Sequence, residues 1–173
     1  AGCHALALQR RGVSVKAIDV SPLSCDAMRR RGITDVECIN LFDPRLGGGF
    51  DTILMLMNGT GIAGKMSGLG GLLRRVASLL APGGQILIDS SDLSYVYQDE
   101  DGSMDIDLSG KYYGEVDYQM RYDRVEGLPF DWLYVDYPLL SAAAREAGLD
   151  CRLVAEGDHY DYLAQLSLER TNP

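Results

Sequence analysis

Asp19 is the first residue whose type and position point to chemistry. It closes the alternating part of the stretch VSVKAIDVSP, residues 13–22, which predicts a strand with this carboxylate at its C-terminal tip. A carboxylate there can cap a helix, pair with an arginine or hold a ligand. Because Ser21 suits the N-cap of the next helix and Pro22 its first turn, the pattern favours a ligand for Asp19.

Gly2 helps to define the class of that ligand. It leads into a helical segment at residues 3–12, and a glycine there lets the backbone approach a ligand where the helix dipole favours negative charge. Asp19 lies at the tip of the following strand, where an acid accepts hydrogen bonds from both hydroxyls of a ribose. Ribose binding by itself fits NAD, FAD or S-adenosylmethionine.

The second half of the chain offers a possible general base and a group of tyrosines. His159 lies in a turn beside Asp158 and Tyr160; it can take a proton near neutral pH, or it can simply be an exposed turn residue. The tyrosines either line a substrate pocket or pack a surface segment onto the fold. The candidates for such a pocket are Tyr95, Tyr97, Tyr112, Tyr113 and Tyr160.

The scaffold for these side chains is predicted to be α/β, with a doubly wound, Rossmann-like sheet. Strands that alternate with helices imply a mostly parallel sheet covered on both faces, and the short join at residues 157–159 makes the last two strands an antiparallel hairpin. The expected helices are 3–12, 21–31, 65–80 and 138–148. The expected strands are 13–19, 34–40, 51–58, 85–90, 149–157 and 160–170, with a turn at 81–84.

Residues 91–137 differ in character and read as an insertion of β-hairpin type. Val116, Tyr118, Met120 and Tyr122 alternate with polar residues, which predicts a strand with one buried face. The insertion either covers a sheet edge or forms a lid over a ligand, since loops at strand C-termini carry ligands in open α/β sheets.

Composition excludes several classes of protein. The chain has 173 residues, enough for one domain, and its net charge of −9 argues against a nucleic-acid partner. No apolar run is long enough to span a bilayer, and no signal peptide is visible. Four cysteines without CxxC spacing and two histidines argue against a zinc site and fit free thiols in a reducing cytoplasm.

Several segments together resemble the class I S-adenosylmethionine-dependent methyltransferases. AGCHALALQRRGVSVKAIDVSP is similar to the end of the family's glycine-rich motif and its acidic ribose-binding motif. FDTILMLMN resembles the fourth strand, LLRRVASLLAPGGQILID resembles the next helix, PGG turn and fifth strand, and the terminal hairpin resembles strands six and seven. The likeness covers residues 1–92 and 138–169, with the PGG segment as its most specific part.

The resemblance implies a cofactor site. Gly2 would be the last glycine of the cofactor loop, with Cys3 and His4 near the methionine moiety. Asp19 would hold the ribose hydroxyls, and Met57 and Asn58 would lie by the transferred methyl. The adenine would be contacted by Val20, Asn40 and Leu41.

The family's first strand and leading glycines have no counterpart before Ala1. We therefore expect the native protein to extend upstream, residues 1–173 to form a single N-terminally incomplete domain, and the sheet, which lacks a central strand, to be split.

Methyl transfer from a sulfonium depends mainly on proximity, alignment and exclusion of water, because the cofactor carries the activation. A general base such as His159 is needed only for a protonated acceptor. We expect a small-molecule acceptor, no membrane partner and no metal. The alternatives are a non-catalytic module that binds S-adenosylmethionine or S-adenosylhomocysteine, and a nicotinamide-dependent oxidoreductase.

Overall fold

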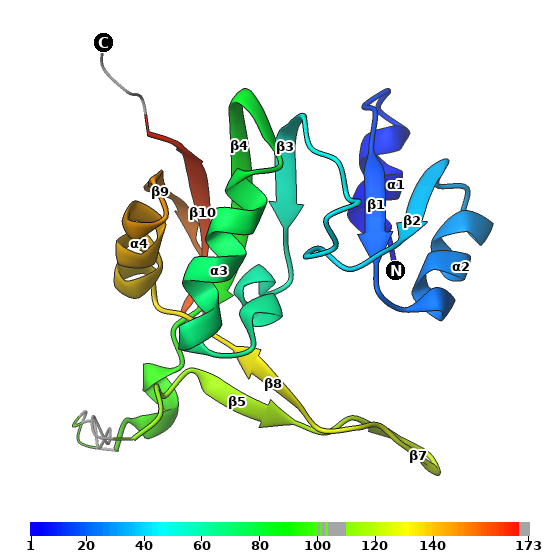
Figure 1. Cartoon of the computed structure of the whole chain (residues 1–173). Helices are drawn as coiled ribbons and strands as arrows, with labels where there is room; N and C mark the ends of the chain where they lie inside the picture. The colour runs from blue at the N-terminus through cyan, green and yellow to red at the C-terminus, as the bar shows by residue number, and fades with distance from the viewer. Residues whose placement is uncertain (100, 102, 104–109, 170–173) are drawn as a thin grey trace. The chain divides into compact units, whose positions relative to one another are not determined.

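The structure is a computed structural model that describes residues 1–99, 101, 103 and 110–169. The chain divides into two compact units, Ala1–Gly47 and Gly48–Pro173 (Figure 1). The described strands form separate sheets, β1–β2 in the first unit and β3-β4-β10-β9 in the second, so the expected division of the sheet is confirmed. The expectation of a single domain stays a prediction.

The first unit packs two helices with a short parallel pair of strands. β1 (Lys16–Asp19) runs parallel to β2 (Asp35–Cys38), and Asp19 lies opposite Cys38. The helices are α1 (Cys3–Gln9) and α2 (Pro22–Arg30). A small apolar core joins them and consists of Ala17, Cys25, Met28 and Ile33, with Ala5, Leu6 and Val36 against it.

The start of α2 follows directly from the local sequence. The Ser21 Oγ accepts a hydrogen bond from the backbone N–H of Ser24 at 3.3 Å, and Pro22 occupies the first helical position. The serine oxygen satisfies one free N–H group of the helix N-terminus, and the proline has no N–H group to satisfy. The predicted cap is therefore confirmed.

The second unit is built on a mixed four-stranded sheet. β3 and β4 are parallel, whereas β10 is antiparallel to both β4 and β9. The α/β class and the antiparallel terminal hairpin are therefore confirmed. The strands are β3 (Phe50–Met55), β4 (Leu80–Ser91), β9 (Leu149–Glu156) and β10 (Asp161–Leu168).

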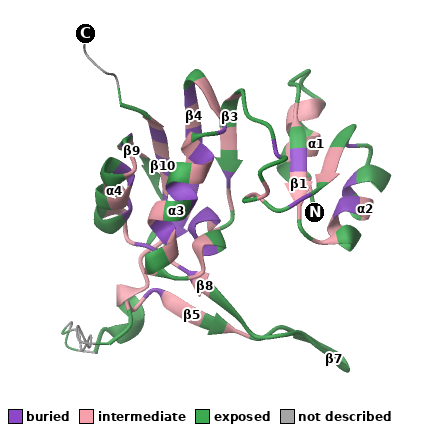
Figure 2. Ribbon diagram, in the orientation of Figure 1, coloured by how far each residue is buried: buried purple, intermediate pink, exposed green. Residues whose placement is uncertain are grey.

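Two helices and a short 3-10 turn complete the body of this unit: α3 (Met66–Ala77), α4 (Tyr137–Glu146) and η1 (Gly59–Ala63). Figure 2 shows the buried stripe along α3. It comes from the spacing of Leu69, Leu72, Leu73 and Val76, all at most 1% exposed.

The turn predicted at residues 81–84 belongs to β4. Phe50 lies opposite Leu80 and Thr52 opposite Gln85, so β4 contains extra residues that bulge out of the ladder. Gly83 has a positive φ of 78°, and a Cβ at Gly84 would lie 2.8 Å from the Phe50 carbonyl oxygen. The two glycines permit this bulge, which explains why the segment has the sequence of a turn.

The described residues between β4 and α4 form the predicted β-type insertion, and residues 100, 102 and 104–109 of it lie outside the described part of the chain. It begins with η2 (Ser94–Tyr97). β5 (Glu115–Tyr118) then pairs with β8 (Phe130–Leu133), and β6 (Arg121–Tyr122) pairs with β7 (Val125–Glu126) beyond them.

The prediction of one buried face along residues 116–122 is wrong for its outer half. Val116 and Tyr118 are half-buried, but Met120 and Tyr122 are exposed. The reason is that β6 and β7 form a separate two-stranded sheet. The apolar side chains that alternate along β6 therefore do not pack against the four-stranded sheet.

The base of the insertion is fixed to the body of the unit. Lys65, the N-cap residue of α3, makes no side-chain cap. Instead Glu115 accepts a hydrogen bond from the backbone N–H of Met66 at 2.9 Å. The carboxylate thereby satisfies a free N–H and complements the positive end of the helix dipole.

Candidate active site

Asp19 lies half-buried at the tip of β1, as predicted. Its Oδ1 accepts a hydrogen bond from the Ser21 N–H at 2.8 Å, which shapes the turn into α2. Among the described residues, no hydrogen bond reaches its Oδ2. One oxygen of the carboxylate therefore serves the fold and the other remains able to accept from a hydroxyl group.

The residues expected to contact the adenine flank this tip in the first unit. Val20 follows Asp19 and is exposed, while Asn40 and Leu41 follow the end of β2. The Asn40 Oδ1 already accepts from the Phe42 N–H at 2.8 Å, so its second lone pair is the one left for an adenine amino group.

Position 2 requires glycine for two physical reasons. Its φ is +71°, in the left-handed region, and a Cβ there would overlap the Ile33 Cδ1 and lie 2.8 Å from the Met28 Cγ. Cys3 and His4 follow it and are exposed, with the Cys3 Sγ 3.6 Å from the His4 Nδ1. The glycine is thus explained by the packing of α1 as well as by the role that the resemblance implies.

Met57 and Asn58 lie in a turn, not in the strand predicted for residues 51–58. β3 ends at Met55, and both residues have left-handed backbones, with φ of 67° and 62°. A left-handed conformation costs a non-glycine residue about 1–2 kcal/mol, so a strong interaction must hold this turn.

That interaction comes from Asp89 at the end of β4. Its carboxylate accepts three successive backbone N–H groups, from Met57 at 3.0 Å, from Asn58 at 2.8 Å and from Gly59 at 3.2 Å. Hydrogen bonds to a charged group are stronger than neutral ones, and here they compensate for the left-handed backbone. Asp89 therefore fixes the backbone of the turn from which the exposed Met57 side chain projects.

A buried polar network supports the same turn from behind. The Ser90 hydroxyl donates to the Asn58 Oδ1 at 2.7 Å and lies 2.8 Å from the Thr60 hydroxyl. Asn58 and Thr60 both donate to the Leu133 carbonyl, at 3.1 and 2.9 Å. The network ties the turn after β3 to β4 and to β8.

Asp89, Thr60 and Ser90 were not among the residues that the sequence indicated. The signal for Asp89 was present, because QILIDS ends an apolar strand with an acid in the same way that VSVKAID does. Thr60 and Ser90 give no such signal, since a buried hydroxyl is recognised only by its partners.

The predicted tyrosines form two separate groups. Tyr95 stacks on Tyr160 with ring centroids 4.8 Å apart and on His159 at 5.8 Å, and all three are exposed. Tyr160 also has a left-handed φ of 60°. The structure thus gathers the candidate base and two candidate substrate residues into one exposed aromatic cluster.

Tyr97, Tyr112 and Tyr113 make up the second group, with centroids 6.2 Å apart for Tyr97–Tyr113 and 4.5 Å for Tyr112–Tyr113. The Tyr112 hydroxyl donates to Asp136 at 2.7 Å and that of Tyr113 to Asp92 at 2.9 Å. Burial raises the pKa of both phenols well above its ordinary value. These hydroxyls anchor the insertion, which favours packing over substrate contact for this group.

Residues 1–99, 101, 103 and 110–169 contain no group of three or more His, Cys, Asp or Glu side chains placed to hold a metal ion. Within the same residues, no helix has the length and apolar character needed to cross a membrane.

One solved structure is closely similar to this chain. An S-adenosylmethionine-dependent methyltransferase from Bacteroides fragilis, in complex with S-adenosyl-L-homocysteine, is 52% identical with a TM-score of 0.89. The match covers 96% of this chain and 68% of that one. The chain therefore belongs to the S-adenosylmethionine-dependent methyltransferases, a family of enzymes that use S-adenosylmethionine as their cofactor. This membership excludes the nicotinamide-dependent oxidoreductase.

More distant structures share the fold. The sugar N-methyltransferase KedS8 from Streptoalloteichus is 19% identical, with a TM-score of 0.62 over 94% of this chain and 75% of its own. CalS10, an amino pentose methyltransferase from Micromonospora echinaspora, is 16% identical, with a TM-score of 0.63 over 95% and 78%. No protein-family model and no curated protein matched the sequence.

Proposed function

We propose that the protein transfers a methyl group from S-adenosylmethionine to a small-molecule acceptor. The observation that carries the cofactor part is the Asp19 carboxylate at a strand tip, with Oδ1 engaged in the turn and Oδ2 able to accept from a ribose. This donor set fits the cofactor, which supplies the activated methyl group when bound. The residues proposed to hold the cofactor are Gly2, Cys3, His4, Asp19, Val20, Asn40, Leu41, Met57 and Asn58.

The chain's own residues supply binding and orientation in this proposal. Asp19 orients the ribose, and Asp89 fixes the backbone of Met57 and Asn58, the residues that the family resemblance assigns to the reacting end of the cofactor. Alignment of this kind provides most of the rate in an in-line displacement, and it requires no metal or redox group from the protein.

The exposed cluster of Tyr95, His159 and Tyr160 supports a small acceptor. Flat aromatic faces bind the apolar faces of sugars, rings and amines, and the known functions of KedS8 and CalS10 concern sugars. The net charge of −9 opposes binding to nucleic acid. All four cysteines are free, which fits a reducing cytoplasm.

Asp19→Asn tests the cofactor site. The asparagine oxygen still accepts from Ser21, but the group facing the ribose loses its charge and one acceptor. We expect the Kd for S-adenosylhomocysteine, measured by calorimetry on the full-length protein, to rise roughly tenfold or more. Asp26→Asn is the control, because Asp26 lies on the surface of α2, where its one ion pair among the described residues is with Arg30. Equal affinity in the wild type and Asp19→Asn would contradict the assignment.

His159→Ala tests the proposed general base. We expect turnover with an acceptor that arrives protonated to fall about 100-fold, the usual lower range for acid–base catalysis, while affinity for S-adenosylhomocysteine stays unchanged. Tyr95→Phe, which removes only a hydroxyl group and keeps the ring against His159, distinguishes acid–base chemistry from ring stacking, and it should retain most of the turnover. Unchanged turnover in His159→Ala would remove this residue from the mechanism. A full-length enzyme that binds S-adenosylmethionine but methylates no acceptor would support the non-catalytic module.

A further inference from the structure

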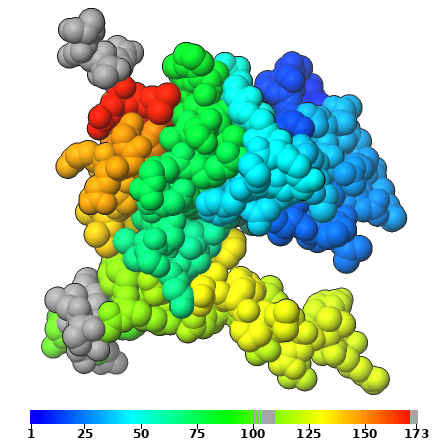
Figure 3. All heavy atoms as spheres, viewed as in Figure 1, coloured from blue at the N-terminus to red at the C-terminus, as the bar shows by residue number. Residues whose placement is uncertain are grey.

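The outer hairpin, defined as residues 119–128, exposes an unusual amount of apolar surface. It contains β6 and β7, and Figure 2 shows it as exposed along its whole length. Figure 3 shows it as a narrow extension of the second unit. Its large apolar side chains are exposed to 65% at Met120, 85% at Tyr122, 70% at Val125 and 87% at Leu128.

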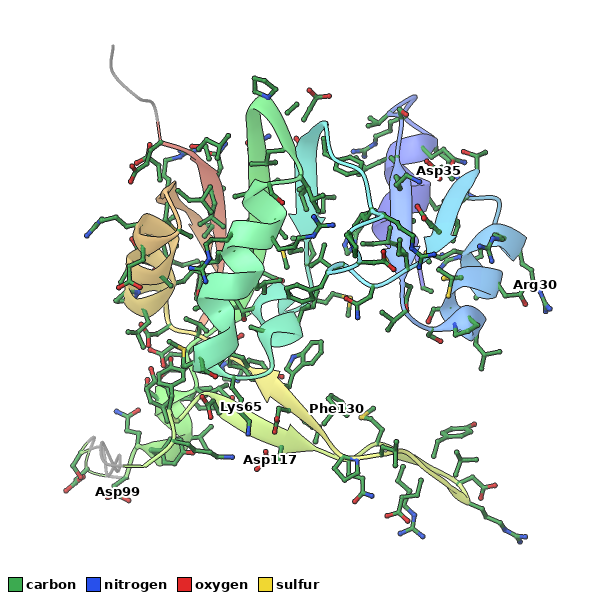
Figure 4. The ribbon with its side chains drawn as sticks, viewed as in Figure 1. Arg30, Asp35, Lys65, Asp99, Asp117 and Phe130 are labelled. Carbon is green, nitrogen blue, oxygen red and sulfur yellow. The ribbon has the colours of Figure 1, made fainter. Side chains whose placement is uncertain are left out.

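Three of these side chains, those of Met120, Tyr122 and Val125, continue a row that starts in the packed base of the insertion. Trp132 lies against Gly61, Phe130 contacts Trp132 edge-to-face at 6.0 Å, and Tyr118 stacks on Phe130 at 5.8 Å. Figure 4 labels Phe130 on this inner part. Met120 and Tyr122 follow Tyr118 at two-residue spacing, and Val125 lies opposite Tyr122. The side chains of this row are half-buried at Trp132 and Tyr118 and exposed at Met120, Tyr122 and Val125.

A bare hairpin of this kind is poorly stable by itself. β6 and β7 pair over only two residues each, and an isolated two-stranded hairpin is marginally stable in water. The four side chains offer on the order of 500 Å² of apolar surface, at the upper end of what monomeric proteins expose. The same area is more than half of the roughly 800 Å² that each partner contributes to a standard protein interface.

The charges on the outer hairpin argue against a polyanionic partner. It carries two arginines, Arg121 and Arg124, and two acids, Asp123 and Glu126, so its net charge is zero while that of the chain is −9. Among the described residues, none of the four forms an ion pair. An anionic membrane or nucleic acid would select an excess of positive charge, which is absent here.

We propose that the outer hairpin is the interface with a second copy of this chain. A two-fold contact brings the same patch together from both copies, so that patch must complement itself. Equal numbers of unpaired positive and negative side chains beside an apolar row meet that requirement. This interface is independent of the methyl-transfer reaction.

Sedimentation of the full-length protein across a range of concentrations tests the proposal. We expect the wild type to be a dimer and Tyr122→Ser/Leu128→Ser to raise its dissociation constant at least 100-fold, with the thermal midpoint within a few degrees of the wild type. Leu23→Ser is the matched control, since Leu23 is 82% exposed on α2 outside the hairpin, and it should leave the dimer intact.

Arg124→Glu tests the contribution of charge. It gives the hairpin a net charge of −2, so the dimer should weaken about tenfold at low salt and recover partly at high salt. A wild type that is monomeric at every concentration would overturn the proposal, as would a dimer unaffected by the double variant. A monomer whose hairpin amides resist hydrogen exchange would instead show that the chain covers the hairpin itself.

Discussion

Asp89→Ala should lower the free energy of unfolding by about 3 kcal/mol, because three backbone N–H groups lose a charged acceptor. Met57 and Asn58 would then keep their left-handed backbones without compensation, and the turn after β3 should relax. If that turn contacts the cofactor, the Kd for S-adenosylhomocysteine rises at least tenfold as well. Urea unfolding and calorimetry on the full-length protein measure the two effects separately.

The control for this variant is Asp51→Asn in the neighbouring strand β3. The Asp51 side chain is exposed and accepts no hydrogen bond among the described residues, so both stability and affinity should match the wild type. Asp89→Glu provides a further comparison, since it keeps the charge but lengthens the side chain. Loss of stability without loss of affinity in Asp89→Ala would show that the turn is structural and that Met57 and Asn58 lie outside the cofactor site.

Gly61→Ala should also destabilise the protein by about 3 kcal/mol, because the added methyl group would push the Trp132 ring away from the buried backbone at position 61. A Cβ at this position would overlap the Cε2, Nε1 and Cδ2 atoms of Trp132. Trp132 is the only tryptophan of the chain, so its fluorescence reports the displacement directly. Unfolding monitored by this signal and by circular dichroism gives the stability change.

Two further variants separate the clash from a general effect of removing glycine. Gly61→Ala should cost much less stability in a Trp132→Leu background than in the wild type, because the smaller side chain leaves room for the methyl group. Gly71→Ala in α3 meets no atom within 4 Å, and it should stabilise the helix by about 0.5–1 kcal/mol. Additive effects of Gly61→Ala and Trp132→Leu would contradict direct contact between the two residues.

The parts of the fold that depend on near neighbours were predictable from the sequence. The start of α2 required only Ser21, Pro22 and the apolar residues that follow, and the end of β1 required only the alternation before Asp19. The boundaries of β3 and β4 were less accurate. Met57 and Asn58 have residue types compatible with a strand, and the glycines at 83 and 84 read as a turn although they form a bulge.

The candidate site divides in the same way. Asp19 was found because an acid at a strand end is a local signal, and its position at the tip of β1 is as predicted. The tyrosines could not be sorted in advance, because packing and ligand contact demand the same residue type. Only their partners distinguish them: Tyr112 and Tyr113 donate to aspartates, whereas Tyr95 and Tyr160 form an exposed stack.

By itself the sequence determined the α/β class, the order of the elements, the methyltransferase resemblance and the carboxylate at the tip of β1. The tertiary structure decided which distant groups complete one another, such as Asp89 with the turn at residues 57–59, Glu115 with the start of α3, and Trp132 with Gly61. It also decided that the outer hairpin is bare. The physical reason is the distance along the chain over which each interaction acts. Periodicity, caps and turns depend on residues a few positions apart, whereas a hydrogen-bond acceptor or a packing partner 30 or more residues away depends on how the chain folds back.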